Sequence, residues 1–174
     1  MNTTISRVVV GVDGSPSSID AVLWAVRYAE LTGAEVEAVT SWAAPTGYGA
    51  AYGTGGFDAV VVDWADIARR TQDTALDQAL PGDSGRIRRT VVCDHPAAAL
   101  VSAAEGAALL VVGCRGHDGF AGMLLGSVSA HVAAHAPCPV VVVRHLPEGA
   151  DPQVDPRRES LAEEVSFLGV PSAP

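Results

Sequence analysis

The chain lacks lysine entirely, since all 11 of its basic residues are arginine. This absence excludes a Walker-type phosphate loop, in which a lysine contacts the phosphates. It equally excludes any mechanism that needs a catalytic or Schiff-base lysine. A site for phosphate in this chain must therefore use main-chain amides, hydroxyl groups or arginine.

Cysteines and long apolar runs are also scarce. The three cysteines, Cys93, Cys114 and Cys138, are odd in number and are not spaced as a metal knuckle. The first residues contain no apolar leader segment, and no apolar run approaches the length that spans a membrane. We therefore expect a cytoplasmic protein with reduced thiols.

Positive charge is sparse, and the formal net charge is -9. Nonspecific binding to nucleic acid or to an anionic membrane needs a basic surface, so the sequence predicts neither partner. Part of the negative charge lies in residues 147–174, which contain five prolines and six acidic residues against two arginines. We interpret this segment as a mobile acidic tail, with one short helix near residues 157–168, outside a domain formed by residues 1–146.

Aromatic residues make up only 5% of a chain that is 48% hydrophobic, so the core must consist mainly of valine, alanine and leucine. Such a core suits a parallel sheet covered by helices on both faces. Short β-branched runs predict strands at 7–12, 35–42, 86–93, 109–113 and 139–144. Amphipathic segments predict helices from Ser17 or Ser18 to Thr32, and at 58–80, 96–105 and 126–136. The glycine-rich residues 43–56 predict no element and indicate a functional or disordered loop.

Strands that alternate with helices predict an α/β fold with right-handed crossovers and a parallel sheet. Ligands of such sheets bind beyond the carboxyl ends of strands, where the strand order reverses. If the first and fourth strands are neighbours there, the loop Asp13-Gly14-Ser15 faces the loop that starts at Gly113. Asp13 is then a candidate to bind ribose hydroxyls, with a helix cap or Asx-turn as the alternative.

The segment after the fourth predicted strand carries the strongest signal in the sequence. Gly113, Gly116 and Gly126 precede Ser127 and Ser129, which stand at the start of a predicted helix. Glycine lets a loop direct several amides at one anion, and a helix N-terminus adds further unpaired amides and a positive dipole end. The pattern predicts a phosphate site. A tight turn without a ligand is the alternative reading.

Other residues of this region allow two readings each. Arg115 either pairs with a phosphate or is a solvated loop charge. His131 and His135 have the spacing of zinc ligands, but without a third ligand we favour ordinary helix packing. We favour solvation for His117 and Asp118, and a packing role for Cys114. Tyr48 and Tyr52 are either a cover for a base or mobile surface aromatics.

Three stretches together resemble the universal stress protein family. They are the opening Val8-Val-Val-Gly-Val-Asp-Gly-Ser-Pro, the glycine loop spaced G-2x-G-9x-G-[S/T], and the ending Ala136-Pro-Cys-Pro-Val-Val-Val-Val-Arg. The resemblance covers about residues 5–146 and implies a Rossmann-like, open five-stranded sheet in the order 3-2-1-4-5. The intact loop is typical of the ATP-binding branch. It implies that Gly113, Gly116, Gly126 and Ser127 bind phosphates, that Asp13 binds ribose, and that the main chain near Ser41 meets adenine.

The resemblance also implies an assembly and a function. Family members commonly form homodimers through the last strand, here Val140, Val141, Val142, Val143 and Arg144. We expect an ATP-binding protein of the stress response, with Asp13 able to assist Mg²⁺ and without efficient catalysis. The alternatives are a slow ATPase or other nucleotide-dependent enzyme, and a dimeric scaffold that binds cyclic AMP or no nucleotide. Two departures stand out: Cys114 replaces the usual hydroxyl residue, and the acidic tail has no counterpart in the family.

Overall fold

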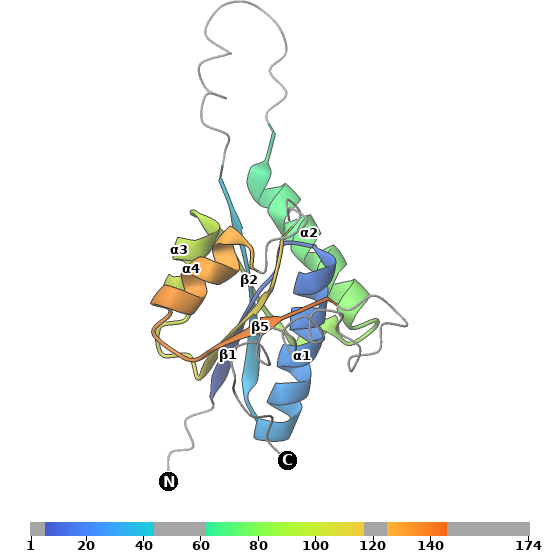
Figure 1. Cartoon of the computed structure of the whole chain (residues 1–174). Helices are drawn as coiled ribbons and strands as arrows, with labels where there is room; N and C mark the ends of the chain where they lie inside the picture. The colour runs from blue at the N-terminus through green and yellow to red at the C-terminus, as the bar shows by residue number, and fades with distance from the viewer. Residues whose placement is uncertain (1–5, 44–61, 117–124, 146–174) are drawn as a thin grey trace, which may run out of the picture.

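The computed structural model describes residues 6–43, 62–116 and 125–145, and within them a parallel sheet lies between two layers of helices (Figure 1). The sheet has five strands in the order β3-β2-β1-β4-β5, and every neighbouring pair is parallel. This confirms the predicted fold class and strand order. The strands are β1 (Arg7–Gly11), β2 (Glu35–Trp42), β3 (Arg88–Cys93), β4 (Leu109–Gly113) and β5 (Val140–Val143).

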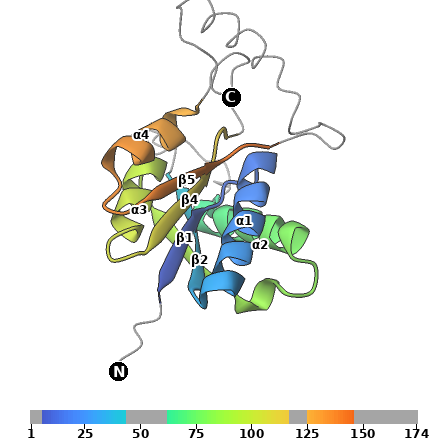
Figure 2. The same cartoon turned by 60° about the horizontal axis from the view of Figure 1, so that its bottom comes forward.

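Helices cover both faces of the sheet, as Figure 2 shows from a second direction. On one side lie α1 (Pro16–Thr32) and α2 (Trp64–Ala79), and on the other lie α3 (Pro96–Ala103) and α4 (Ser127–His135). Successive side chains of a strand point to opposite faces, so Val8 and Val10 pack with α1 while Val9 packs with α3 and α4. Each layer is thus held by burial of aliphatic side chains against the sheet.

Several element boundaries differ from the sequence prediction. Ser15, not Ser17 or Ser18, is the N-cap of α1, and its hydroxyl accepts a hydrogen bond from the Ser18 amide. The second helix begins at Trp64 rather than at residue 58, because the Asp63 carboxylate caps it through the Asp66 amide. Residues Ser84–Arg86 form a 3₁₀ turn, so the third strand starts at Arg88. The tail 147–174 and most of loop 43–56 lie outside the described residues.

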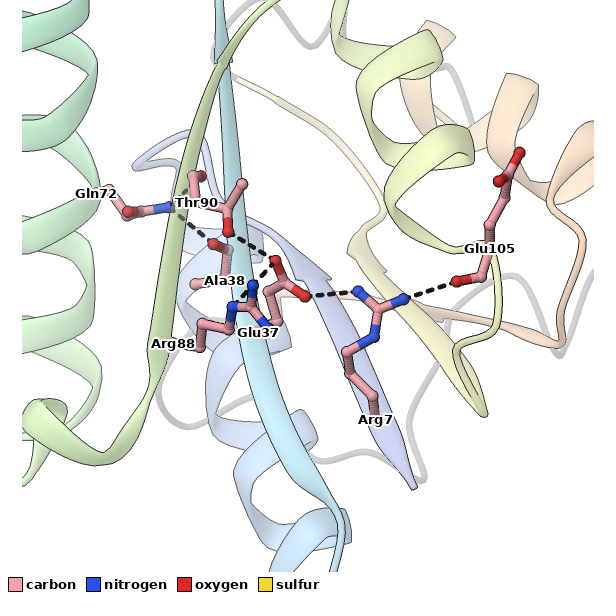
Figure 3. Close-up of polar contacts among 7 residues, drawn as sticks. All are labelled: Arg7, Glu37, Ala38, Gln72, Arg88, Thr90 and Glu105. Carbon is pink, nitrogen blue, oxygen red and sulfur yellow. Dashed lines mark hydrogen bonds and ion pairs between the residues drawn. The ribbon is translucent and has the colours of Figure 1, made fainter. Parts of the chain in front are cut away.

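β2 carries a buried charged side chain, Glu37 (Figure 3). Its carboxylate accepts hydrogen bonds from Arg7 of β1 and Thr90 of β3, both at 2.6 Å. The Arg7 guanidinium also donates to the main-chain carbonyl of Glu105, 2.7 Å away. Burial alone would raise the pKa of Glu37, but the Thr90 and Arg7 contacts outweigh it and leave that pKa below its ordinary value. The network ties three strands and the turn that follows α3 together.

Candidate functional site

A cleft of about 520 Å³ lies at the carboxyl ends of β1 and β4, the two strands from which the chain departs in opposite directions along the sheet. This is where parallel α/β sheets bind ligands. Nine of the ten residues predicted from the sequence line it, and Gly14 does not. The nine are Asp13, Ser15, Ser41, Gly113, Arg115, Gly116, Gly126, Ser127 and Ser129.

Asp13 follows β1 and is exposed at the cleft. Its Oδ1 accepts from the Ser15 amide at 2.9 Å and from the Ser15 hydroxyl at 2.6 Å, which is an Asx-turn. Gly14, with φ 85°, supplies the left-handed conformation that lets the turn close. The turn that the sequence offered as an alternative to ligand binding is therefore present. It engages one carboxylate oxygen and orients the other, Oδ2, toward Gly116.

The glycine loop rests directly on the start of α1. A Cβ at Gly113 would lie 2.5 Å from the Ser17 Oγ and 2.7 Å from the Ser17 carbonyl carbon, so only glycine fits. The Ser17 hydroxyl donates to the Arg115 carbonyl, and the Ser15 hydroxyl lies 3.3 Å from the same oxygen. The sequence pattern places Ser17 only at the possible start of a helix and does not predict this contact, which joins residues far apart in the chain. The approach of α1 accounts for the glycine at 113 without a ligand.

Cys114 connects three elements around the cleft. Its amide donates to the Val143 carbonyl of β5 at 2.7 Å, and its carbonyl accepts from the Gly126 amide at 2.8 Å. The same carbonyl accepts from the buried Ser129 hydroxyl at 3.0 Å, and that hydroxyl also lies 3.0 Å from the Gly126 carbonyl. The Ser129 hydroxyl proton is thus used within the protein and not directed at the cleft. Cys114 itself is buried, in accordance with the expected packing role.

The first turn of α4 opens into the cleft. Gly126 is its N-cap, and no side chain in the described part of the chain caps it. The amide of Ala130 pairs with the Gly126 carbonyl, as the first bond of the helix. The amides of Ser127, Val128 and Ser129 precede that bond, so they are the donors that a helix N-terminus leaves for other partners. Ser127 is exposed beside them and adds a hydroxyl.

The opposite end of the cleft is formed by β2, which continues past the end of β1. Val12 donates to the Val39 carbonyl on the β1 side of β2, whereas the Trp42 carbonyl accepts from Asp94 on the β3 side. Main-chain groups of alternate residues point to opposite sides of a strand, so the Ser41 N–H and C=O point to the β1 side. There β1 has already ended at Gly11, and neither Ser41 group has a partner within the described ranges.

The walls near Ser41 are apolar. Val12 directly follows β1, Val39 comes from β2, Val112 comes from β4, and Pro96 and Leu100 come from α3. A flat heterocycle that enters the cleft would contact these side chains with its faces while its polar edge meets Ser41. Arg115 and Gly116 follow β4, and a Cβ on Gly116 would meet the Oδ2 of Asp13, which follows β1, at 2.8 Å.

Some candidates do not belong to the cleft or are outside the described residues. His131 and His135 stack with ring centroids 4.2 Å apart, and neither lines the cleft. Across residues 6–43, 62–116 and 125–145, no cluster of three or more potential ligands for a metal occurs. His117, Asp118, Tyr48 and Tyr52 fall outside these ranges. No helix in the described part of the chain is long and apolar enough to cross a membrane.

Comparisons with known proteins agree with this architecture. A universal stress protein of Mycobacterium tuberculosis, Rv1996, is 37% identical over 156 residues, which are 84% of this chain and 45% of the relative. The chain therefore spans about half the length of the curated relatives it matches.

Two solved structures show the same fold. The crystal structure of a universal stress protein in complex with cAMP is 30% identical, with a TM-score of 0.52 over 82% of this chain and 98% of that one. The universal stress protein UspA from Lactobacillus plantarum is 23% identical, with a TM-score of 0.64 over 82% of this chain and 100% of that one. The family model for the universal stress protein family matches residues 4–144, from β1 through β5. This chain thus belongs to the universal stress protein family.

Proposed function

We propose that the cleft binds an adenine nucleotide, with ATP as the ligand that its glycine loop favours. One observation carries the proposal: the cleft joins open main-chain groups at the end of β2, the Asp13 carboxylate after the neighbouring strand β1, and the uncapped N-terminus of α4, which follows β4. These suit a base, a ribose and a phosphate chain in that order. The relative in complex with cAMP supports an adenine ligand of this class.

Recognition of the base is assigned to Ser41. Adenine has an acceptor at N1 and a donor at its N6 amino group, which complement an N–H and a C=O. Guanine has the opposite pattern, a donor at N1 and an acceptor at O6. In the place of adenine, guanine would put a donor against the Ser41 N–H and an acceptor against the Ser41 C=O. Groups left without a hydrogen bond in this way cost binding free energy. The site should therefore prefer adenine, and the apolar walls from α3 and the strands should bury the ring.

Recognition of the sugar and the phosphates is assigned to the other residues of the cleft. The Asp13 Oδ2 accepts from ribose hydroxyls, while Gly116, Gly126 and the first amides of α4 donate to phosphate oxygens. Ser127 adds a hydroxyl donor and Arg115 a positive charge. Ser15, Gly14 and Ser129 shape these loops through the bonds described above. Mg²⁺, if bound with ATP, would neutralise phosphate charge, and Asp13 is the carboxylate near enough to the cleft to assist it.

The identity of the ligand is tested by releasing nucleotides from the purified protein and identifying them by mass spectrometry. Calorimetric titration with ATP, AMP, cAMP and GMP then ranks their affinities. We expect ATP to bind more tightly than AMP, because the α4 amides contact the added phosphates, and GMP to bind at least about tenfold more weakly than AMP. No binding of any adenine nucleotide at millimolar concentration would contradict the proposal.

A charge variant tests the phosphate end without harm to the fold. Ser127→Glu places a carboxylate in the first turn of α4, where it stabilises the helix dipole. The same charge repels phosphates, so we expect ATP affinity to fall by about 10- to 100-fold, which is about 1.4 to 2.8 kcal/mol. Ala130→Glu is the matched control, because this exposed α4 residue does not line the cleft. Equal losses in both variants would contradict a phosphate site at this helix end.

We further propose that the protein acts in the cytoplasm as a homodimer, in the stress response, and that nucleotide binding rather than turnover is its role. Among the described residues that line the cleft, Asp13 is the single carboxylate, and phosphoryl transfer needs a positioned nucleophile as well as charge neutralisation. Phosphate release from ATP and Mg²⁺ by the purified protein should stay at the level of the Ser127→Glu variant. Release clearly above it would favour the slow ATPase instead.

A further inference from the structure

Behind the base end of the cleft lies a chain of buried polar groups that the proposed nucleotide contacts do not include. Thr40, on the face of β2 opposite to Ser41, donates its hydroxyl to the Val12 carbonyl at 2.7 Å. Gln72 of α2 donates to the Thr40 Oγ1 at 3.1 Å. Thr40 is 5% exposed, Gln72 is 1% exposed and Val12 is 4% exposed. Buried polar groups need a reason, because their desolvation is costly when unpaired.

The direction of these hydrogen bonds is fixed by chemistry. The Gln72 Nε2 also lies 3.1 Å from the Ala38 carbonyl and 3.2 Å from the Thr90 carbonyl, as Figure 3 shows. Carbonyl oxygens only accept, so the amide group among them must be the NH₂. Gln72 is therefore a donor to Thr40, and the single hydroxyl proton of Thr40 must go to Val12. The chain runs from Gln72 through Thr40 to the last carbonyl before Asp13.

This carbonyl is the one that a continued sheet would have used. The ladder between β1 and β2 proceeds through the bond from Val12 to the Val39 carbonyl. Its next bond would run from the Ser41 N–H to the Val12 carbonyl, since bonds of a parallel ladder alternate between the strands. In the structure the Thr40 hydroxyl, rather than the Ser41 N–H, donates to the Val12 carbonyl, and β1 ends at Gly11.

We propose that Thr40 and Gln72 are positioning residues for base recognition, because their hydrogen bonds hold the Val12 carbonyl and keep the Ser41 N–H open to the cleft. The inference rests on the proposed adenine site and extends it to two residues that do not touch the ligand. It predicts that loss of the Thr40 hydroxyl lets Ser41 bond to Val12, so that the base loses its donor while the phosphate end is unchanged.

The free protein provides the first test, which needs no ligand. Residue-resolved amide exchange by NMR should show the Ser41 amide at least about 100-fold less protected than the Val39 amide, which pairs within the sheet. In Thr40→Val, an isosteric change that removes the donor, Ser41 should become at least about tenfold more protected. Protection of Ser41 equal to that of Val39 in the unchanged protein would overturn the inference, as would an unchanged Ser41 rate in Thr40→Val.

Nucleotide titration provides the second test. Thr40→Val should weaken AMP about tenfold and bring the affinities of AMP and GMP close together, with inorganic tripolyphosphate bound as before. Thr40→Ser keeps the donor and should bind like the unchanged protein. Thr90→Val is the matched control, since it removes a hydroxyl bond of the same sheet, to Glu37, away from the cleft.

The outcomes separate the two proposals. An unchanged preference for AMP over GMP in Thr40→Val overturns the role of Thr40, even if the nucleotide site is real. A protein that binds no adenine nucleotide contradicts the proposed function, and amide exchange at Ser41 then decides alone whether Thr40 holds the Val12 carbonyl. Equal losses of AMP in Thr40→Val and Thr90→Val would mean a general loss of stability and would likewise overturn the inference.

Discussion

At the scale of single residues, the glycines of the cleft differ in what they are needed for. A Cβ at Gly113 would collide with the main chain of Ser17, which cannot move without shifting α1. A Cβ at Gly126 would meet its nearest neighbours at 3.5 Å, and Gly126 has the extended conformation that any residue adopts. The motif therefore combines one glycine that packing requires with another whose side of the cleft has space for a methyl group.

Alanine substitutions separate these two roles. Gly113→Ala should lower the free energy of unfolding by about 3 kcal/mol or more, because the added methyl overlaps backbone atoms. Gly126→Ala should cost less than about 1 kcal/mol, the small difference between glycine and alanine at an N-cap. Urea unfolding followed by circular dichroism measures both. Equal stability of the two variants would contradict the close contact between the glycine loop and α1.

Glu37 makes stability depend on pH. Its folded pKa lies below the ordinary value, so its carboxylate stabilises the fold above the unfolded pKa of about 4.3. That contribution is lost as the pH falls through the folded pKa. Glu37→Gln should therefore lower the free energy of unfolding by about 1–3 kcal/mol at pH 7, and by clearly less at about pH 3.

The exposed Glu35, on the same strand, is the matched control for Glu37. Glu35→Gln should change the stability by less than about 0.5 kcal/mol at either pH. Urea unfolding at the two pH values measures the difference. A cost of Glu37→Gln that does not depend on pH would contradict the ionised, hydrogen-bonded state of this carboxylate.

Candidate site residues could be predicted singly but not in their contacts. Asp13 and Gly113 were identifiable because each stands at the end of a buried strand, and Gly116 and Gly126 because they are spaced in a pattern that leads to a helix start. The contact of Ser17 with the Arg115 carbonyl could not be found, because it joins segments about a hundred positions apart and a serine near a helix start already has a local explanation. Gln72 was missed for a similar reason, since a polar residue on an amphipathic helix is ordinarily assigned to solvent.

At the scale of elements, hydrophobic periodicity predicted each described α-helix and strand. The elements β1, β2, β4 and α3 begin at the predicted residue, whereas α2 and β3 begin later than predicted. The start of α2 is set by Asp63, whose carboxylate accepts from the amide three residues later and so fixes the first turn of the helix. The 3₁₀ turn at Ser84–Arg86 shortens β3 in the same manner. Caps and short turns depend on local hydrogen bonds, and a pattern of apolar residues does not contain them.

The edge strand β5 allows a sharp test of the proposed homodimer. The carbonyls of Pro139 and Val143 accept from β4 and from Cys114, so odd-numbered residues of β5 face the sheet. Val140 and Val142 therefore direct their main-chain groups to the open edge. Val142→Pro removes an outward N–H, and an edge strand tolerates proline at such a position. We expect a monomer with nearly unchanged circular dichroism.

Val141→Pro is the control for β5, since it removes an inward N–H and should destabilise the fold by about 3 kcal/mol. Sedimentation equilibrium measures the assembly of each variant. A Val142→Pro protein that remains dimeric would contradict pairing through this strand and would place any dimer interface elsewhere.

At the scale of the whole molecule, the strand order of the sheet could be predicted from the alternation of strands and helices together with the family resemblance. Alternation predicts a parallel sheet but leaves several strand orders possible. The resemblance selected 3-2-1-4-5, and the structure has that order. It places the loops after β1 and β4 at one cleft, which is why residues separated by a hundred positions form one candidate site. The open main chain at Ser41 depends on where two strands end, and only the register of the folded sheet reveals it.

A ligand that contacts β1, β2, β4 and α4 together should stabilise the domain as a unit. ATP at about 100 times its dissociation constant should add about 2.7 kcal/mol by mass action. For a domain of this size we expect Tm to rise by roughly 5–10 °C, which differential scanning calorimetry measures. Adenosine and tripolyphosphate each contact one end of the cleft and bind more weakly, so at the same concentration each should raise Tm by less. A rise with tripolyphosphate equal to that with ATP would mean that the base end contributes nothing, and would contradict the assignment of adenine to Ser41.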